Sequence, residues 1–168
     1  FDGECAVIAT DIPAEEQGTG MLFNMDGEEV GMISSSVWND TGKNVVNAYG
    51  ISDLKPIIEL LINGKSVPYI GIYGTTVTEQ LAEEHKMPSG IYVADVDPDS
   101  PAMAAGIQIG DIICEASGEE IKDIAAYQNI VIGSSVGETM EFVGKRLGSD
   151  GYVNIKFSVV TTEKEEVK

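Results

Sequence analysis

The side chains that could take part in catalysis are few, and they do not form a complete catalytic set. Nucleophilic acyl transfer needs a hydroxyl or thiol, an imidazole within hydrogen-bond reach and a carboxylate that orients the imidazole. The chain has a single histidine, His85. His85 follows a helix predicted over Thr76 to Glu84 from capping-box spacing, which indicates a surface or helix-terminal residue. We therefore expect no catalytic residue and no peptide cleavage from this chain alone.

Metal and phosphate chemistry have little support. The sequence contains no Cys-x-x-Cys, no His-x-x-x-His and no Walker-type loop. The stretch Asp97-Pro98-Asp99 lacks the spaced ligands of a calcium loop and is typical of a turn. We expect no metal and no cofactor.

Composition excludes further classes of partner. The 168 residues carry 28 acidic and 10 basic side chains, a net charge of −18, which would repel nucleic acid and anionic lipid. No apolar run approaches the roughly 18 to 20 residues that span a bilayer. Cys5 and Cys114 each lie in an apolar run, where cysteine behaves as a small hydrophobe. Because the chain starts at Phe1 and enters strand-like sequence almost at once, we expect a piece of a longer protein, with any membrane attachment upstream.

The first third of the chain is rich in predicted strands. Short β runs occur at Val7 to Thr10 and Val45 to Tyr49, and a hairpin is predicted from Met21 to Ile33 around Asp26-Gly27. Apolar residues then repeat with helical spacing from Leu54 to Ile62. Ser52 and Asp53 are good N-caps for this helix, and Asn63-Gly64 is a good end.

The rest of the chain forms a second predicted unit. It alternates strands and short helices: an apolar run at Tyr69 to Tyr73, strands at Ile91 to Val96 and Ile112 to Ala116, a helical turn from Ala102 ended by Gly106, a helix from Asp123 to Val131, and a hairpin of Met140 to Val143 with Tyr152 to Val160. Beyond Thr161 the residues are charged, and we expect them to fray.

Several motifs of this second unit resemble a PDZ domain of the HtrA (DegP, DegS) family. Tyr69-Ile70-Gly71-Ile72 resembles the family's carboxylate-binding loop, and Gly90-Ile91-Tyr92-Val93 resembles its following strand. The segment from Ser100 to Ile113 is similar to the signature Ser-Pro-Ala…Ala-Gly-Leu…Gly-Asp-Val-Ile. The resemblance covers about residues 67–160 and implies a small β-sandwich or partial barrel with two helices.

The upstream third resembles the end of the family's trypsin-like protease barrel. Leu22-Phe23-Asn24, Asp26-Gly27-Glu28 and Asp53-Leu54-Lys55-Pro56 match elements of the protease and of the linking helix. The nucleophile pattern Gly-Asn-Ser-Gly-Gly is not preserved, because Gly18 or Thr19, depending on the gap, stands where the family has serine. Glu15 and Glu16 would also place negative charge at the oxyanion hole. The resemblance therefore implies a pseudoprotease segment without a catalytic residue.

Together these patterns predict a mixed α+β, mainly β fold with four parts. We expect an incomplete second barrel of a trypsin-like protease over residues 1–52, a linking helix and connector over 53–66, a PDZ domain over 67–161 and a charged tail over 162–168. Half a barrel leaves sheet edges and apolar faces uncovered, so we expect self-association into a homo-oligomer. Trp38, in the polar loop from Ser34 to Asn44, would mark a contact surface or pack on missing barrel.

The resemblance also implies which residues bind a ligand. A PDZ domain adds a peptide to a sheet edge beside a helix, and a tight loop receives its terminal carboxylate. The residues implied are Tyr69, Ile70, Gly71, Ile72, Tyr73, Ile124, Tyr127, Gln128 and Val131. Glycine at position 71 lets the backbone turn and lets a carboxylate approach closely. The alternative for Ile70, Ile72 and Ile124 is a place in the core, since pocket walls and cores share composition.

The hypothesis that follows is a peptide-binding PDZ module of an HtrA-like, catalytically degenerate protein. It would read C-termini of peptides or of misfolded chains, in protein quality control at the bacterial cell envelope or outside the cell. The alternatives are a regulatory fragment of an active serine endopeptidase, whose histidine and aspartate lie upstream, and a purely structural assembly domain. No basic residue lies in the proposed loop, and the net charge is strongly negative, so we expect neutral or basic peptides with apolar ends.

Overall fold

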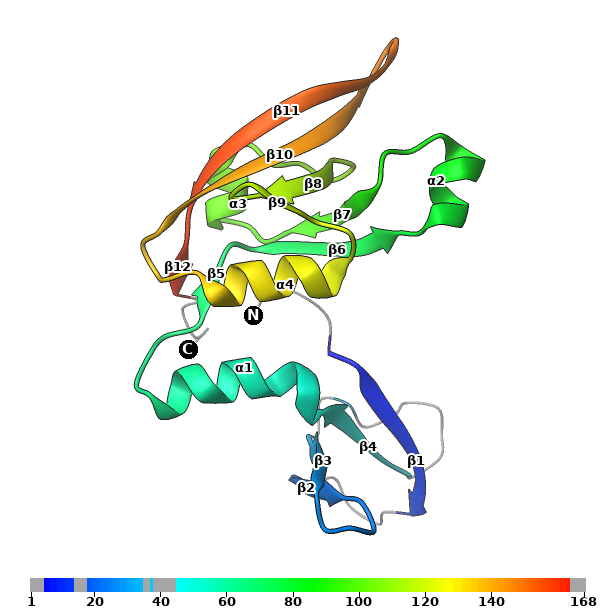
Figure 1. The fold of residues 1–168 in the computed structure, drawn as a ribbon, viewed down its shortest axis with the longest axis vertical. Helices are drawn as coiled ribbons and strands as arrows, with labels where there is room; N and C mark the ends of the chain where they lie inside the picture. Colours follow the sequence, from blue (N-terminus) through cyan, green and yellow to red (C-terminus); the bar gives the residue numbers. More distant parts are fainter. Residues whose placement is uncertain (1–4, 14–17, 35–36, 38–44, 164–168) are drawn as a thin grey trace. The chain divides into compact units, whose positions relative to one another are not determined.

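The computed structural model describes residues 5–13, 18–34, 37 and 45–163 (Figure 1). The chain forms two compact units, Cys5–Lys65 and a second that begins at Ser66. The described part is mainly β, with twelve strands and four helices. Trp38 and the Glu15-Glu16 pair lie outside the described residues.

The N-terminal unit is an antiparallel four-stranded sheet with the order β1-β4-β3-β2. Its strands are β1 (Val7–Pro13), β2 (Gly20–Phe23), β3 (Glu29–Ile33) and β4 (Val45–Gly50). The β2–β3 turn is fixed by Asn24, whose Oδ1 accepts hydrogen bonds from the N–H groups of Asp26 and Glu28 at 3.0 and 2.9 Å. The hairpin expected there is therefore present.

Helix α1 (Ile51–Ile62) packs against β3 and β4 and so belongs to the N-terminal unit. The prediction that Ser52 or Asp53 caps it is wrong. Its N-cap is Gly50, which provides no side chain. Asp53 lies in the first turn, where its Oδ2 accepts the N–H of Ala6 at 2.7 Å. The carboxylate therefore ties the start of the chain's first strand to the helix instead of capping it.

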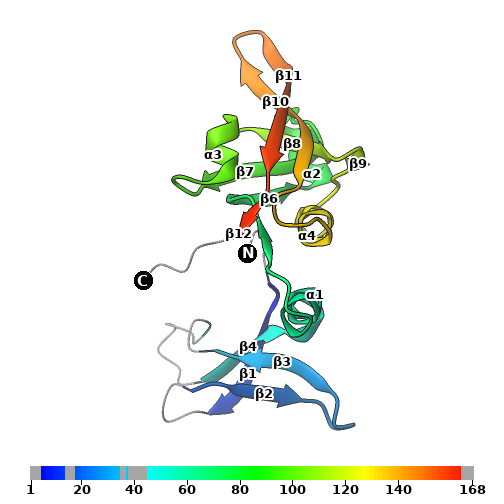
Figure 2. The same ribbon diagram turned by 90° about the vertical axis from the view of Figure 1, so that its left-hand side faces the viewer.

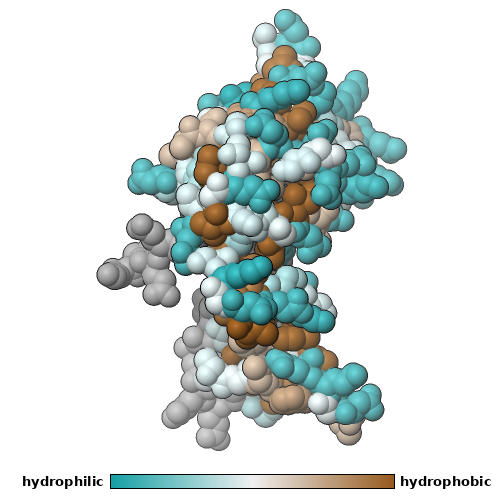
Figure 3. Space-filling model, turned by 60° about the vertical axis from the view of Figure 1, so that its left-hand side comes forward, coloured by the Kyte–Doolittle hydropathy of each residue, from teal (hydrophilic) through white to brown (hydrophobic). Residues whose placement is uncertain are grey.

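Apolar side chains remain exposed on the N-terminal sheet and its helix. Val7 and Phe23 are 51% and 58% exposed, and Ile62 at the end of α1 is 75% exposed. Figure 3 shows apolar surface, in brown, interrupting the hydrophilic surface of the molecule. Apolar side chains of this sheet are therefore exposed, as the sequence predicts, and whether the sheet is part of a larger barrel stays a prediction.

The C-terminal unit is built on an antiparallel sheet with the order β11-β10-β8-β7-β6, and β9 pairs with β8. Its strands are β6 (Ile72–Val77), β7 (Gly90–Val96), β8 (Ile112–Ala116), β9 (Glu119–Glu120), β10 (Thr139–Gly148) and β11 (Gly151–Val160). The β10–β11 hairpin projects beyond the other strands (Figure 2). Strand β6 is therefore the last strand at one end of this sheet.

Three helices accompany this sheet: α2 (Glu79–His85), α3 (Pro101–Ala105) and α4 (Ile124–Gly133). The prediction that a helix starts at Thr76 is wrong. Pairing of β6 with β7 continues to Val77, opposite Gly90. The helix is capped two residues later, where Thr78 Oγ1 accepts the N–H of Leu81 at 3.3 Å. Sheet hydrogen bonds decide the position of the boundary, and a local spacing rule does not contain them.

A two-stranded sheet closes the unit. Strand β12 (Thr162–Glu163) pairs with β5 (Pro68–Tyr69), with Thr162 opposite Tyr69. The expectation that the chain frays directly after Thr161 is therefore wrong for these two residues. Their partner strand immediately precedes Ile70 and Gly71, so the end of the described chain holds the start of the proposed loop.

The core of this unit is continuous and apolar. Fully buried side chains from the sheet meet those of α4, among them Ile91, Tyr127 and Phe142. One buried carboxylate is paired with a partly exposed cation: Asp111, 1% exposed, accepts from Nε of Arg146 at 2.6 Å and from its Nη2 at 2.7 Å, and the Arg146 side chain is 33% exposed. This hydrogen bond raises the pKa of Arg146. In the described part of the chain, no α-helix has both the length and the apolar character required to cross a bilayer.

Candidate peptide-binding site

The proposed loop turns at Gly71, and only glycine fits there. Its φ is +93°, in the left-handed region that L side chains disfavour. A Cβ on Gly71 would lie 2.3 Å from Ser100 Cβ and 2.8 Å from Tyr69 Oη. Both distances are far shorter than a van der Waals contact. The glycine is thus required by conformation and by packing at once.

The loop rests on the segment that joins β7 to α3. The N–H of Asp97 donates to the carbonyl of Gly71 at 2.9 Å, and the N–H of Ala102 donates to the carbonyl of Ile70 at 3.0 Å. In a trans peptide the N–H points opposite to the C=O. The N–H groups of Gly71 and Ile72 therefore point away from the supporting segment.

Two tyrosine hydroxyls strengthen this support. Tyr69 Oη and Tyr73 Oη both donate to Oδ2 of Asp97, the latter at 2.9 Å. Ser100, 3% exposed, caps α3 by accepting the N–H of Met103 at 3.2 Å. The segment between β7 and α3 thus supports the loop through both backbone and side-chain hydrogen bonds.

Strand β6 and helix α4 lie side by side (Figure 1). The first N–H of α4, on Ile124, donates to Thr76 Oγ1 at 3.1 Å. Asp123 caps the helix, as predicted, by accepting the N–H of Ala126 at 2.7 Å. A strand at the end of the sheet order and an adjacent helix are the two walls that strand addition requires.

The sequence-implied residues fall into two groups by burial. Ile70, Ile72, Tyr127 and Val131 are at most 1% exposed and belong to the core cluster. Gln128 and Tyr69 are also buried. Gly71 is buried as well, while Tyr73 and Ile124 are half-buried. The structure brings all nine onto β5, β6, the loop between them and α4, and their contact with a ligand stays a prediction.

Three residues of the site were not predicted from the sequence. The sequence predicts a helix at Thr76, a turn at Asp97 and, for Ser100, only a place in the signature motif. Ser100 and Thr76 set the packing and the helix position, and Asp97 gathers the tyrosine hydroxyls. The available signal was the small polar residue at position 100 within the signature motif, directly after a turn.

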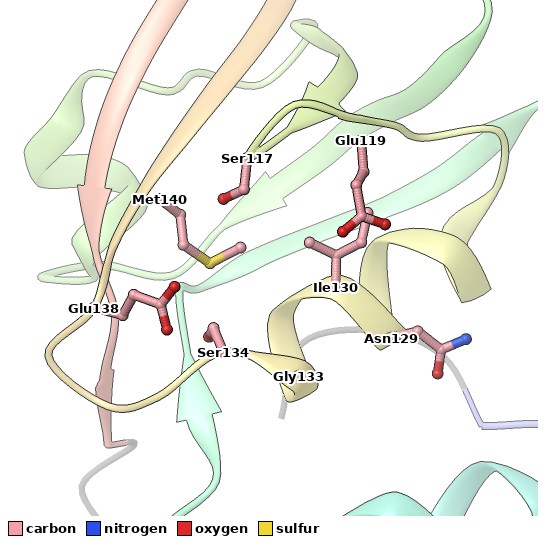
Figure 4. A pocket seen from close by; sticks show the side chains of 8 residues that line it. All are labelled: Ser117, Glu119, Asn129, Ile130, Gly133, Ser134, Glu138 and Met140. Atoms are coloured by element: carbon pink, nitrogen blue, oxygen red, sulfur yellow. The ribbon is translucent and has the colours of Figure 1, made fainter.

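Two pockets of this unit are lined by none of the nine sequence-implied residues, although Ser100 lines the second of them. One, of about 300 Å³, lies between the β8–β9 turn, the end of α4 and the start of β10 (Figure 4). The hydroxyls of Ser117 and Ser134 and the carboxylate of Glu138 surround the thioether of Met140 there. The other, of about 410 Å³, lies between α3 and the end of β11. Neither contains a sequence-implied ligand residue.

The positions that the sequence singles out for catalysis lie at the surface. Gly18 and Thr19 are exposed in the segment before β2, and His85 is exposed at the end of α2. Among the described side chains, no three His, Cys, Asp or Glu residues gather in a way that could hold a metal ion.

A comparison with family models identifies the class of domain to which this fold corresponds. Residues 92–146 match the family model described as PDZ domain, a fold that binds the ends of peptides by adding them to a sheet. The match includes α4 and the supporting segment but begins after the loop and β6.

The wider chain identifies the relatives of this domain. It is 30% identical over 155 residues to a probable periplasmic serine endoprotease, DegP-like, of Halomonas elongata, over 88% of this chain and 32% of that protein. It is also 30% identical over 174 residues to the serine protease Do-like HtrA of Bacillus subtilis, over 95% and 38% of the two chains. The chain therefore carries a PDZ domain and is homologous to DegP/HtrA serine proteases. It spans about a third of the length of the curated relatives it matches.

Solved structures agree with this fold. The serine endoprotease from Yersinia pestis is 26% identical with a TM-score of 0.50, over 87% of this chain and 47% of that one. The HtrA-type protease AlgW with tripeptide is 22% identical with a TM-score of 0.56, over 88% and 50%. At the latter identity the likeness concerns the fold alone.

Proposed function

We propose that the PDZ unit captures the C-terminus of a peptide as an added strand along β6. The terminal carboxylate is received by the N–H groups of the loop Tyr69 to Ile72, and the last side chain lies toward α4. The observation that carries this proposal is the conformation of Gly71, supported from behind so that the loop amides are directed away from the support. Preorganised amides of this kind bind anions without reorganisation.

Peptides with free and amidated C-termini test the proposal directly. We expect measurable binding, by fluorescence polarisation, of peptides that end in a free carboxylate on an apolar residue. Amidation or a charged last residue should weaken binding at least about tenfold, since a lost charge-assisted hydrogen bond is worth about 1.5–3 kcal/mol. Equal affinity for acids and amides would refute carboxylate capture.

A pair of helix variants tests the second wall. Ile124, at the start of α4, is half-buried, while its neighbour Ala125 is exposed. Ile124→Lys should lower peptide affinity about tenfold or more, because a charged group would replace an apolar wall. Ala125→Lys adds the same charge one residue away and should change affinity less than about twofold. Similar losses in both variants would mean that α4 does not line the site.

We further propose that the N-terminal unit is a degenerate protease remnant and that the module serves an HtrA-like protein of the bacterial envelope in recognising misfolded chains. The support is the missing serine at Gly18 and Thr19 and the periplasmic relatives. The second candidate, regulation of an active serine endopeptidase, is favoured by the homology to named serine proteases. Neither candidate predicts cleavage of casein by this chain alone, so the two are separated by the sequence upstream of it: a histidine and an aspartate at the family's catalytic positions would favour the active endopeptidase, and their loss would favour the degenerate one.

We also propose that the chain self-associates. The exposed apolar side chains Val7 and Phe23 on the N-terminal sheet support this proposal. Light scattering should show a species larger than 17.9 kDa. Phe23→Ser should shift that species toward monomer, and a monomeric wild-type chain would refute the proposal.

A further inference from the structure

One carboxylate joins both sides of the proposed loop. Asp97 Oδ2 accepts the hydroxyl protons of Tyr69 and Tyr73, which lie two residues before and two residues after Gly71. The N–H of the same Asp97 donates to the Gly71 carbonyl at 2.9 Å. Asp97 is thus bound to three positions of a five-residue segment.

This arrangement differs from the ordinary role of aspartate in a turn. Turn aspartates usually accept hydrogen bonds from N–H groups one to three residues ahead. Here the partners of the side chain are 28 and 24 residues away. Hydrogen bonds to an ionised acceptor are about twice as strong as neutral ones. Two of them on one oxygen therefore fix the loop more firmly than backbone contacts alone.

The carboxylate also lies close to the turn. Tyr69 Oη is 2.8 Å from the position that a Cβ of Gly71 would take, and that hydroxyl is itself bonded to Asp97. Only the hydroxyl group of Tyr69 therefore lies between the Asp97 carboxylate and Gly71. The stretches 69–73 and 97–102 contain no lysine, arginine or histidine. The loop proposed to receive an anion is thus built around an acidic side chain.

We propose that Asp97 is a positioning and specificity residue of this site. Its hydrogen bonds hold the loop in the binding conformation. Its charge lowers affinity for a bare carboxylate and favours peptides that carry lysine or arginine next to the C-terminal residue. This inference rests on the proposed peptide binding and names the class of ligand, a C-terminal peptide that is apolar at its last position and basic beside it.

Three variants separate the two roles. Asp97→Asn keeps an oxygen acceptor for the tyrosines and removes the charge, Asp97→Ala removes both, and Tyr73→Phe removes one hydrogen bond. Asp150→Asn, at the exposed β10–β11 turn, makes the same change in net charge far along the hairpin and serves as control. Each is measured against three probes: a free-acid peptide with alanine beside its apolar last residue, the same free acid with lysine in place of that alanine, and the C-terminal amide of the alanine peptide.

A full charge about 10 Å away changes affinity about twofold at the dielectric constant of water and about fourfold at half that value. Asp97→Asn should therefore bind the alanine peptide about two- to fourfold more tightly and lose its preference for lysine. It should also lose the salt dependence that distinguishes the two free acids in the wild type. The amide should bind unchanged. Asp97→Ala and Tyr73→Phe should bind both free acids several-fold more weakly than the wild type.

The outcomes distinguish this inference from the proposed function. If Asp97→Asn behaves like Asp150→Asn on all three probes, the charge has no role and the inference is wrong. If Tyr73→Phe binds like the wild type and hydrogen exchange at Gly71 and Ile72 is unchanged, the positioning role is wrong. If the wild type binds none of the probes, the proposed function itself fails.

Discussion

Replacement of Gly71 by alanine tests whether the loop is packed as the structure shows. Alanine at a φ of +93° costs about 1 kcal/mol for the left-handed backbone. Its Cβ would also overlap Ser100 Cβ at 2.3 Å, and neither atom belongs to a flexible side-chain end. Overpacking of this kind costs about 1–3 kcal/mol. We therefore expect Gly71→Ala to lower the stability of the C-terminal unit by about 2–4 kcal/mol.

Gly106 provides a matched control in the same unit. Its φ of +88° is nearly that of Gly71, but a Cβ there would meet nothing within 4 Å. Gly106→Ala should therefore show the backbone cost alone, about 1 kcal/mol. The difference between the two variants isolates the contact with Ser100.

Urea-dependent hydrogen exchange in β7 and β8 measures this difference within the C-terminal unit. The method suits a chain of two compact units, because unfolding signals from the whole molecule would mix them. Loss of stability by equal amounts in Gly71→Ala and Gly106→Ala would refute the packing of the loop against the β7–α3 connection. That result would also remove the structural basis for the proposed carboxylate-binding site.

Three further outcomes follow from single contacts. Arg146→Ala leaves the buried carboxylate of Asp111 without its charged partner, and urea-dependent hydrogen exchange in the C-terminal unit should show a loss of about 3 kcal/mol, partly restored by adding Asp111→Asn. Thr76→Val removes the acceptor of the Ile124 N–H and should cost about 1 kcal/mol by the same measurement, together with several-fold weaker peptide binding. Burial raises the pKa of the Cys114 thiol above its ordinary 9.0. The folded C-terminal unit therefore retains that proton to higher pH than the unfolded chain, and its stability should fall as pH rises above about 9, less steeply in Cys114→Ser.

Local patterns predicted the segments whose structure depends on near neighbours. Asp123 caps α4, and Gly106 ends α3 in the left-handed conformation, both as expected from turn and cap chemistry. The strand from Ile112 to Ala116 has the expected bounds. For the two helix ends the deciding hydrogen bonds lie within about five residues, whereas the strand pairs with β7 and β10 and was found from its apolar run alone.

Long-range pairing explains what the sequence could not supply. Thr76 has good local helix-start spacing, but the ladder between β6 and β7 includes it in a strand. Thr162 looks like part of a charged tail until it pairs with Tyr69, 93 positions earlier. Asp97 was interpreted as a turn residue because the tyrosines that it binds are 24 and 28 positions away. No window short enough for periodicity analysis contains these partners.

The residues that support the proposed binding loop are distant from it in the sequence. The Tyr69–Ile72 loop is short, but its conformation depends on β12 beneath Tyr69, on Ser100 against Gly71 and on Asp97 between the tyrosines. A loop held at several points loses little conformational freedom when it meets a ligand, so less of the interaction energy is spent on ordering it. Variants at distant supports should therefore act on peptide affinity through the loop, even where they touch no ligand atom.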